Sequence, residues 1–373
     1  MRCVNFAVLA FTLLATAALA QPVVGPEVVS PPLTAFDGAS IAPLRDGYVI
    51  AWSEDGRIRA GHLDATLHLT GAMLDLPVYD ADGAARRPSV ATTGTSVLVA
   101  WEEIGPSFDG TIIASLSPDA GRLTNGPRLL AIAHQDTPHV YAEKGTYSVV
   151  QGVLVFSVSE SLEVSGISPF DGAASIAVSP AGIASAAVRY ELGSPCVGSG
   201  GGFPHWGAEC PTHATITIAT PSRVFTLYDD YGLWLFPVAL TELPLLTSNG
   251  DGFIVTWRSK TPQAALLNAD GTLALWPFGD IETTPAIAGE GSRALAVWHD
   301  SALWSSASLF GVVRQDDGTT TPWFSIGNGR NPMVVASGSN RFVVLYQIDS
   351  PSHGTILAGR LIDLQEGRKR ATR

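Results

Sequence analysis

Charged side chains are scarce in this 373-residue sequence. They make up 15% of the residues, against about 25% in an ordinary soluble domain. Lysine occurs three times, at Lys144, Lys260 and Lys369, and the formal net charge is −12. A surface that follows phosphates needs clustered positive charge, so this composition argues against nucleic acid as a partner. The apolar share of 46% excludes a disordered chain.

Long apolar runs are absent after the first twenty residues. Residues 6–20 are apolar and follow Arg2, and Ala18-Leu19-Ala20 is a small-x-small cleavage site. We therefore expect residues 1–20 to be a signal peptide rather than a buried N-terminal helix. The mature protein is then secreted or periplasmic, and it is not inserted into a membrane.

Cysteine is also rare, because only Cys196 and Cys210 follow the expected cleavage site. In an oxidising compartment, a pair that closes a ring of about fifteen residues is most simply a disulfide. The alternatives are free thiols, or a zinc site with His205 and His213. The zinc site is disfavoured because the spacing lacks the Cys-x-x-Cys pairs of structural zinc sites. We expect no metal and no other cofactor.

Complete catalytic motifs are missing. The sequence has no Gly-x-Ser-x-Gly elbow, His-Glu-x-x-His or P-loop. Residues 80–83 fall short of a calcium loop. Residues 53–56 and 316–318 fall short of a sialidase aspartate box. These absences favour a non-catalytic protein, although they leave the question of enzymatic activity open.

An internal repeat is what the sequence does contain. Proline precedes an aromatic residue by 13 positions at Pro88/Trp101, Pro244/Trp257 and Pro285/Trp298, and by 14 at Pro332/Tyr346. Trp52 begins the series, and degenerate copies end at Gln151 and Tyr190. The 294 positions from Trp52 to Tyr346 make six intervals that average 49. The sequence therefore predicts seven repeats.

Each repeat has the size and pattern of a propeller blade. About four strands fit into 49 residues, and the second strand is apolar at consecutive positions, as in residues 97–101. A strand with one wet face would alternate, so both faces of this strand must be buried. We predict an all-β, seven-bladed β-propeller over residues 21–362, rather than tandem sandwiches or a β-helix.

The two ends of the propeller are expected to meet. The seventh repeat has only three strands, and residues 23–30 have the composition of a strand. Pairing this N-terminal strand with the last blade would close the ring and remove two free edges. Residues 363–373 are basic and are expected to form a flexible tail.

The repeat resembles those of uncharacterised secreted bacterial β-propeller proteins. Their units read roughly Pro-x-Val-Ala, Gly, an apolar run, Trp, Ile-x-Ala and an Asp-Gly turn, and the likeness covers residues 35–361. It implies the fold and a bacterial origin. That group has no shared catalytic motif to carry over, so it implies nothing about activity.

Propeller topology brings two kinds of loop to one face: those before the first strand and those after the second strand of each blade. Polar residues gather at both positions, although loops that meet water are polar in any case. Residues 191–212 form an insertion that belongs to the same face. The candidate ligand-binding residues are Arg87, Glu102, Glu103, Asp136, His139, Trp206, Arg258, His299, Asp300 and Asn331.

We expect an exported, monomeric binding protein that takes an unknown protein or glycan partner on this face. The alternative is an extracellular carbohydrate-active hydrolase or lyase with its site at the mouth of the central channel. In that case Glu102, Glu103, Asp136, His139, His299 and Asp300 are its candidate acids, bases or metal ligands. A structural envelope component is the third hypothesis.

Overall fold

The structure is a computed structural model of the chain, and strands are the regular secondary structure of the residues that it describes. It describes residues 22–29, 37–106, 108–132, 137–143, 145–170, 172–195, 209–231, 242–250, 252–258, 262–278, 281, 283–300, 307–338, 340–350 and 354–364. These residues form seven antiparallel sheets. The number of sheets matches the seven repeats predicted from the sequence.

Each sheet is one blade, and its strands follow the chain from the centre outward. Blades 1 and 2 contain β3 (Ala39–Leu44), β4 (Gly47–Glu54), β5 (Arg57–Asp64), β6 (Leu69–Asp75), β7 (Ala84–Thr92), β8 (Val97–Ile104), β9 (Asp109–Leu116) and β10 (Leu123–Ile132). Blades 3 and 4 contain β11 (His139–Glu143), β12 (Thr146–Gln151), β13 (Leu154–Ser159), β14 (Val164–Pro169), β15 (Ser175–Ser179), β16 (Gly182–Pro195), β17 (Glu209–Ala219) and β18 (Val224–Tyr231).

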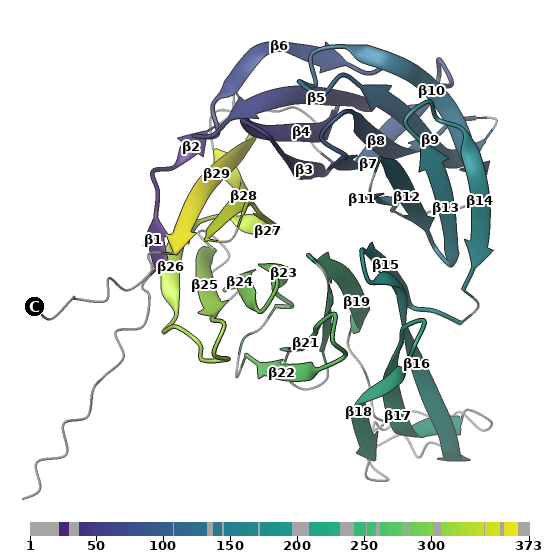
Figure 1. Ribbon diagram of the computed structural model, residues 1–373, viewed down its shortest axis with the longest axis vertical. Coiled ribbons are helices and arrows are strands. Elements are labelled where there is room, and N and C mark those ends of the chain that lie inside the picture. Colours follow the sequence, from purple (N-terminus) through teal and green to yellow (C-terminus); the bar gives the residue numbers. More distant parts are fainter. Residues whose placement is uncertain are drawn as a thin grey trace, which may run out of the picture.

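The remaining three blades follow the same plan. Blades 5 and 6 contain β19 (Glu242–Asn249), β20 (Gly252–Arg258), β21 (Pro262–Leu267), β22 (Leu273–Pro277), β23 (Ala286–Glu290), β24 (Arg293–His299), β25 (Ser308–Arg314) and β26 (Phe324–Asn328). Blade 7 contains β27 (Arg330–Ala336), β28 (Arg341–Ser350) and β29 (Gly354–Leu364), completed by β1 (Pro22–Val24) and β2 (Val28–Val29). The innermost strands of the seven blades surround the centre of the ring (Figure 1).

The ring is closed by the N-terminal segment, as the sequence predicts. β1 pairs with β29 from Pro22↔Leu364 to Val24↔Ile362, and β2 pairs with the same strand at Val28↔Gly359 and Val29↔Ala358. Two short strands therefore take the place of the single strand expected. The last strand reaches Leu364, two residues beyond the predicted end of the propeller at residue 362.

The apolar runs are buried on both faces because each blade packs between two neighbours. In β8, Val97, Val99 and Trp101 belong to the core between blades 1 and 2. The intervening Leu98 and Ala100 belong to the core between blades 2 and 3. All five side chains are 0% exposed. The alternation of side chains along one strand thus feeds two separate cores, which confirms the physical reason given for the propeller.

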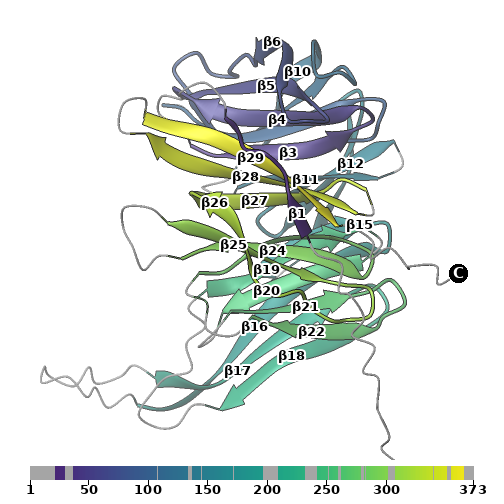
Figure 2. The ribbon, with the colours of Figure 1, turned by 90° about the vertical axis from the view of Figure 1, so that its left-hand side faces the viewer.

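The β16–β17 hairpin extends well beyond its blade (Figure 2). Residues 191–212 are predicted from the sequence to be an insertion after the second strand of blade 4. In the structure the strand ladder continues into it, through Glu191↔His213 and Leu192↔Pro211 to Pro195↔Glu209. Continued pairing satisfies the backbone N–H and C=O groups that an isolated loop would leave to water. The ends of the insertion are therefore part of the sheet.

Candidate functional site

The strand order places most of the predicted site residues on one face of the ring, here called the top face. It is the face at which each innermost strand begins and each second strand ends. Register pairs join these two positions directly, as in Arg86↔Glu102 of blade 2 and Arg330↔Gln347 of blade 7. Because all blades have the same orientation in a propeller, these positions share one face.

A cavity of about 500 Å³ opens on the top face between blades 7 and 1. We call it the top cavity. Its volume falls in the range of ordinary ligand pockets. Blade 1 contributes the start of β3 and the two residues before it, and blade 7 contributes the start of β27 and Gln347 in the second half of β28. The lining residues are Asp37, Gly38, Ala39, Arg330, Asn331, Pro332, Met333 and Gln347.

Polar groups and apolar surface occur together in the top cavity. The Asn331 amide nitrogen donates a hydrogen bond of 3.0 Å to Gln347 Oε1. This bond uses one donor and one acceptor, so Asn331 Oδ1 and Gln347 Nε2 stay outside it. Arg330 Nη2 lies 2.8 Å from Asp349 Oδ1, and both side chains are exposed. Pro332 and Met333 supply an apolar wall.

The backbone at this site is held in an unfavourable conformation. Asn331 has a φ of 48°, and Arg87 has a φ of 51° at the corresponding place in blade 2. Each precedes a proline and sits where the register of its innermost strand shifts, between Arg330 and Met333 and between Arg86 and Ser89. The left-handed backbone conformation costs a residue with a Cβ about 1–2 kcal/mol of conformational free energy. Such strain is found more often at functional sites than elsewhere.

Arg87 and Glu102 are brought together, next to blade 1. Arg86 donates from Nε and Nη2 to the two oxygens of Glu102, at 2.9 and 3.0 Å. Arg87 Nη1 lies 3.4 Å from Glu102 Oε2. The hydrogen bond to Glu102 raises the pKa of Arg86. The Arg87 N–H also donates to Asp37 O at 3.2 Å, which links this ion cluster to the wall of the top cavity.

Glu103 faces away from the cluster into the protein. It is 0% exposed. Its Oε2 accepts from Trp101 Nε1 at 3.1 Å and from the Tyr79 N–H at 3.0 Å, and its Oε1 accepts from the Asp80 N–H at 2.6 Å. These three donors fix the connection between β6 and β7. Glu103 therefore organises the blade, and its carboxylate is not presented to the top face.

The remaining described candidates belong to other blades. His139 begins β11 and is exposed to solvent, while the surrounding blades lower the pKa of its imidazole by desolvation. His299 ends β24, its carbonyl oxygen accepts a hydrogen bond from the Thr283 hydroxyl, and burial lowers the pKa of its imidazole. Arg258 ends β20 and is half-buried, and Asp300 is exposed.

Several predictions lie outside the described residues. They are the signal peptide at residues 1–20, Asp136, Trp206 and Cys196. Cys210 lies in β17, but its side chain is not described, so the disulfide stays a prediction.

Sequence reasoning missed Gln347, Asp37 and Asp349. Gln347 directly follows the aromatic anchor Tyr346, which is the position that pointed to Glu102 in blade 2. That signal was present and could have identified it. Asp37 lies ahead of β3 in a repeat without the proline, so no motif marked it. Within the described part of the chain, no group of three or more His, Cys, Asp or Glu residues is placed to hold a metal ion.

Comparison with solved structures supports the fold. A protein of unknown function from Dyadobacter fermentans is similar with a TM-score of 0.50 and 12% identity, over 92% of this chain and 99% of that one. The chain is a seven-bladed β-propeller. No family model matches it, and neither does any curated protein. The described residues include no helix of the length and apolar character needed to cross a membrane.

Two further structures are similar at lower scores. The WD40 domain of coronin from Toxoplasma gondii has a TM-score of 0.47 and 11% identity, over 94% of this chain and 90% of that one. A GH43_1 enzyme from Xanthomonas citri has a TM-score of 0.35 and 12% identity, over 89% of this chain and 90% of that one. Likenesses at this level carry no argument about function.

Proposed function

We propose that this propeller is an exported, monomeric binding protein that takes a glycan in the top cavity. One observation carries the proposal: the Asn331–Gln347 amide pair lies beside Arg330 and an apolar wall, in a cavity of about 500 Å³. Export after removal of residues 1–20 belongs to the same proposal.

The chemistry of the cavity matches that of a sugar. A sugar ring presents neighbouring hydroxyl groups, each of which both donates and accepts, and it also has an apolar face. Asn331 Oδ1 and Gln347 Nε2 offer one acceptor and one donor next to each other. Met333 and Pro332 offer a surface for the apolar face. Among the two partner classes expected from the sequence, these features favour the glycan.

The polar groups are also held in place before a ligand arrives. The amide–amide bond orients both side chains, and the Asp349 carboxylate orients Arg330. The proline that follows Asn331 restricts the local backbone. A site with fixed polar groups loses less conformational entropy on binding than a flexible loop does.

The hydrolase alternative finds less support in the described residues. A glycosidase needs two available carboxyl groups, one of them with a raised pKa. Glu102 is bound by two arginines, and Glu103 is bound by three hydrogen-bond donors. Among the described residues, the carboxyl groups whose pKa departs from the ordinary value have it lowered, as in Asp64, Asp119 and Asp316.

Binding to a saccharide panel tests the proposal. The panel contains oligomers of glucose, galactose, N-acetylglucosamine and galacturonate, and binding is followed by calorimetry. We expect at least one class to bind. Asn331→Ala and Gln347→Ala should each weaken it about tenfold, which corresponds to the loss of one net hydrogen bond. The control Asn125→Ala, on the outer strand β10 of blade 2, should leave the affinity unchanged.

Two results would overturn the proposal. The first is no binding by any saccharide, together with an intact fold. The second is binding that survives both cavity substitutions. Release of shortened saccharides during the titration, at a rate that depends on protein concentration, would instead establish the hydrolase.

A further inference from the structure

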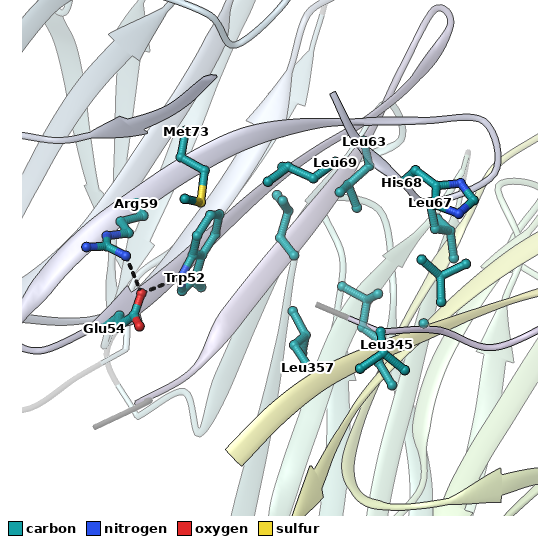
Figure 3. Close-up of a pocket in the computed structure, with 15 residues that line it drawn as sticks. Trp52, Glu54, Arg59, Leu63, Leu67, His68, Leu69, Met73, Leu345 and Leu357 are labelled. Carbon is teal, nitrogen blue, oxygen red and sulfur yellow. Dashed lines mark hydrogen bonds and ion pairs between the residues drawn. The ribbon is translucent and has the colours of Figure 1, made fainter. Parts of the chain in front are cut away.

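A second cavity lies between blade 7, which closes the ring, and blade 1. β1 and β2 complete blade 7 by pairing with β29, and the chain then enters blade 1 at β3, so the two blades meet through packed side chains beside the closure of the ring. Between them lies an opening of about 170 Å³, which we call the seam crevice. Its walls come from β4 to β6 of blade 1 and from β2, β28 and β29 of blade 7 (Figure 3). It is separate from the top cavity, because the two share no lining residue.

The walls of the seam crevice are apolar. Leu63 and Leu69 line it from blade 1, and Leu345 and Leu357 line it from blade 7. Trp52 and Met73 close one end (Figure 3). Leu69 and Met73 are 39% and 47% exposed, so the crevice is open to solvent at its rim. Large apolar side chains left exposed around a concave site indicate a ligand or partner.

The polar groups lie at the two ends and are already engaged. At one end, Arg59 Nη1 lies 2.6 Å from Glu54 Oε2, and Arg59 Nε lies 2.9 Å from Asp75 Oδ1. At the other end, His68 Nδ1 lies 3.9 Å from Asp64 Oδ1. The middle of the crevice therefore offers apolar contact alone.

The size and shape fit a short linear chain. A dry apolar cavity of about 150 Å³ holds one benzene molecule, which has six carbons. By that measure the seam crevice has room for about six or seven carbons. The lining is elongated, from Trp52 and Met73 at one end to Leu67 and His68 at the other (Figure 3). A linear alkyl chain fits this outline better than a ring does.

The charges at the ends select the head group of the ligand. Glu54, Arg59 and His68 line the ends, and the carboxylates of Asp75 and Asp64 pair with Arg59 and His68 from just outside the lining. Even a protonated His68 leaves one negative charge in excess. The whole chain also carries −12. A positively charged head is therefore attracted to the site and a carboxylate head is repelled.

We propose that the seam crevice binds the alkyl chain of a linear aliphatic amine of about six carbons. The site is independent of the glycan proposed for the top cavity. Binding joins blade 7 to blade 1 through shared apolar contacts, so the ligand also stabilises the closed ring.

The methionines of the chain provide a direct test. The sequence contains Met1, Met73 and Met333 only. Met73 lines the seam crevice, and Met333 lines the top cavity. With isotope-labelled methionine methyl groups in the full chain, NMR titration with n-alkylamines from propylamine to nonylamine should shift the Met73 signal and leave Met333 unchanged. The two proposals are therefore tested separately: the glycan proposal for the top cavity can be wrong while the amine proposal for the seam crevice holds, and the reverse.

The dependence on chain length is the quantitative part of the test. Each added methylene should raise the affinity about fourfold while it is being buried. The increase should stop near six or seven carbons, where the crevice is full. At low ionic strength hexylamine should bind about threefold or more tightly than hexanoate. An unchanged Met73 signal, an affinity that still rises at nine carbons, or equal binding of hexanoate would each overturn the proposal.

Two matched variants place the ligand in the crevice. Leu69→Trp fills the crevice from a partly exposed position on the outer strand of blade 1 and should weaken hexylamine at least tenfold. Leu275→Trp makes the same change on the outer strand of blade 5, where Leu275 is 61% exposed, and should have no effect. Equal affinities of these two folded variants would contradict the assignment.

Discussion

The hydroxyl of Tyr346 lies 2.5 Å from Glu27 Oε2 and so joins the seventh repeat to the N-terminal segment. Arg360 strengthens this connection, because it donates from Nε to the Tyr346 oxygen at 3.1 Å and from Nη1 to Gly25 O at 2.8 Å. Burial, followed by the hydrogen bond to Glu27, raises the pKa of Tyr346. An aromatic anchor of the repeat thus also closes the ring.

Glu27→Ala is expected to destabilise the protein through this contact. The substitution leaves the buried Tyr346 hydroxyl without its acceptor and removes the carboxylate near Arg360. We expect the free energy of unfolding to fall by about 1–3 kcal/mol, measured by urea denaturation. The control Glu163→Ala, at an exposed position next to β14, should change it by less than about 0.5 kcal/mol. Equal losses in the two variants would mean that Glu27 does not secure the ring.

Glu103→Gln is expected to be more damaging, because Glu103 is fully buried. The uncharged amide weakens three charge-assisted hydrogen bonds and turns a donor toward other donors. We expect a loss of about 2–4 kcal/mol in unfolding free energy. Trp101→Phe, which removes only one of the donors, should share part of this loss in a double-mutant cycle. Strictly additive losses would contradict the direct contact.

The stability should depend on pH through His139 and His299. Desolvation lowers both pKa values in the folded state, so below pH 6.5 the unfolded chain binds protons that the folded chain does not. Stability is therefore lost as the pH falls from 6.5 toward the folded pKa values.

His139→Gln removes one of these contributions. Between pH 6.5 and pH 5 the unfolding free energy of the variant should depend on pH less steeply than that of the parent, and solvent around the exposed His139 side chain should keep this difference small. Above pH 7.5 the difference in unfolding free energy between the parent and the variant should stay constant, because the His139 imidazole is then neutral in both the folded and the unfolded chain. Parallel curves down to pH 5 would show that His139 titrates equally in both states.

Asn331→Gly separates the conformation of the site from its chemistry. Glycine accepts the φ of 48° without the Cβ penalty, but it adds freedom to the unfolded chain. We expect these effects to offset, with a net change within about 1 kcal/mol. Saccharide affinity should nevertheless fall about tenfold because the amide is gone.

Asp55→Gly provides the matched comparison for Asn331→Gly. Asp55 has a φ of 53° in the turn between β4 and β5 and does not line the top cavity. This variant should keep its saccharide affinity. A loss of affinity in both variants would point to a general change of the top face and not to the Asn331 amide.

The architecture could be predicted because its physical cause is local and repeated. Val97 to Trp101 are apolar at successive positions, and only a sheet packed on both sides can bury all of them. The degenerate copies at Gln151 and Tyr190 were placed by their distance from the well-formed repeats, and the structure contains blades at both. Ring closure could be predicted because the seventh repeat has only three strands and the N-terminal segment has the composition of a fourth.

The candidate site was less predictable, because the role of a polar residue depends on its neighbours in space. Glu102 and Glu103 are adjacent in the sequence and look equivalent. The alternation of β8 directs one toward Arg86 and Arg87 and the other into the protein, toward Trp101 and the β6–β7 connection. Gln347 gained its importance from Asn331 on the neighbouring strand.

The sequence by itself determined the blade count, the strand order within a blade and the face on which loops converge, because these depend on apolar periodicity and chain length. Only the tertiary structure decided which polar groups meet and where space remains. The top cavity and the seam crevice both lie between the first and last blades. Their walls come from opposite ends of the chain, and no local pattern specifies how closely such distant segments pack.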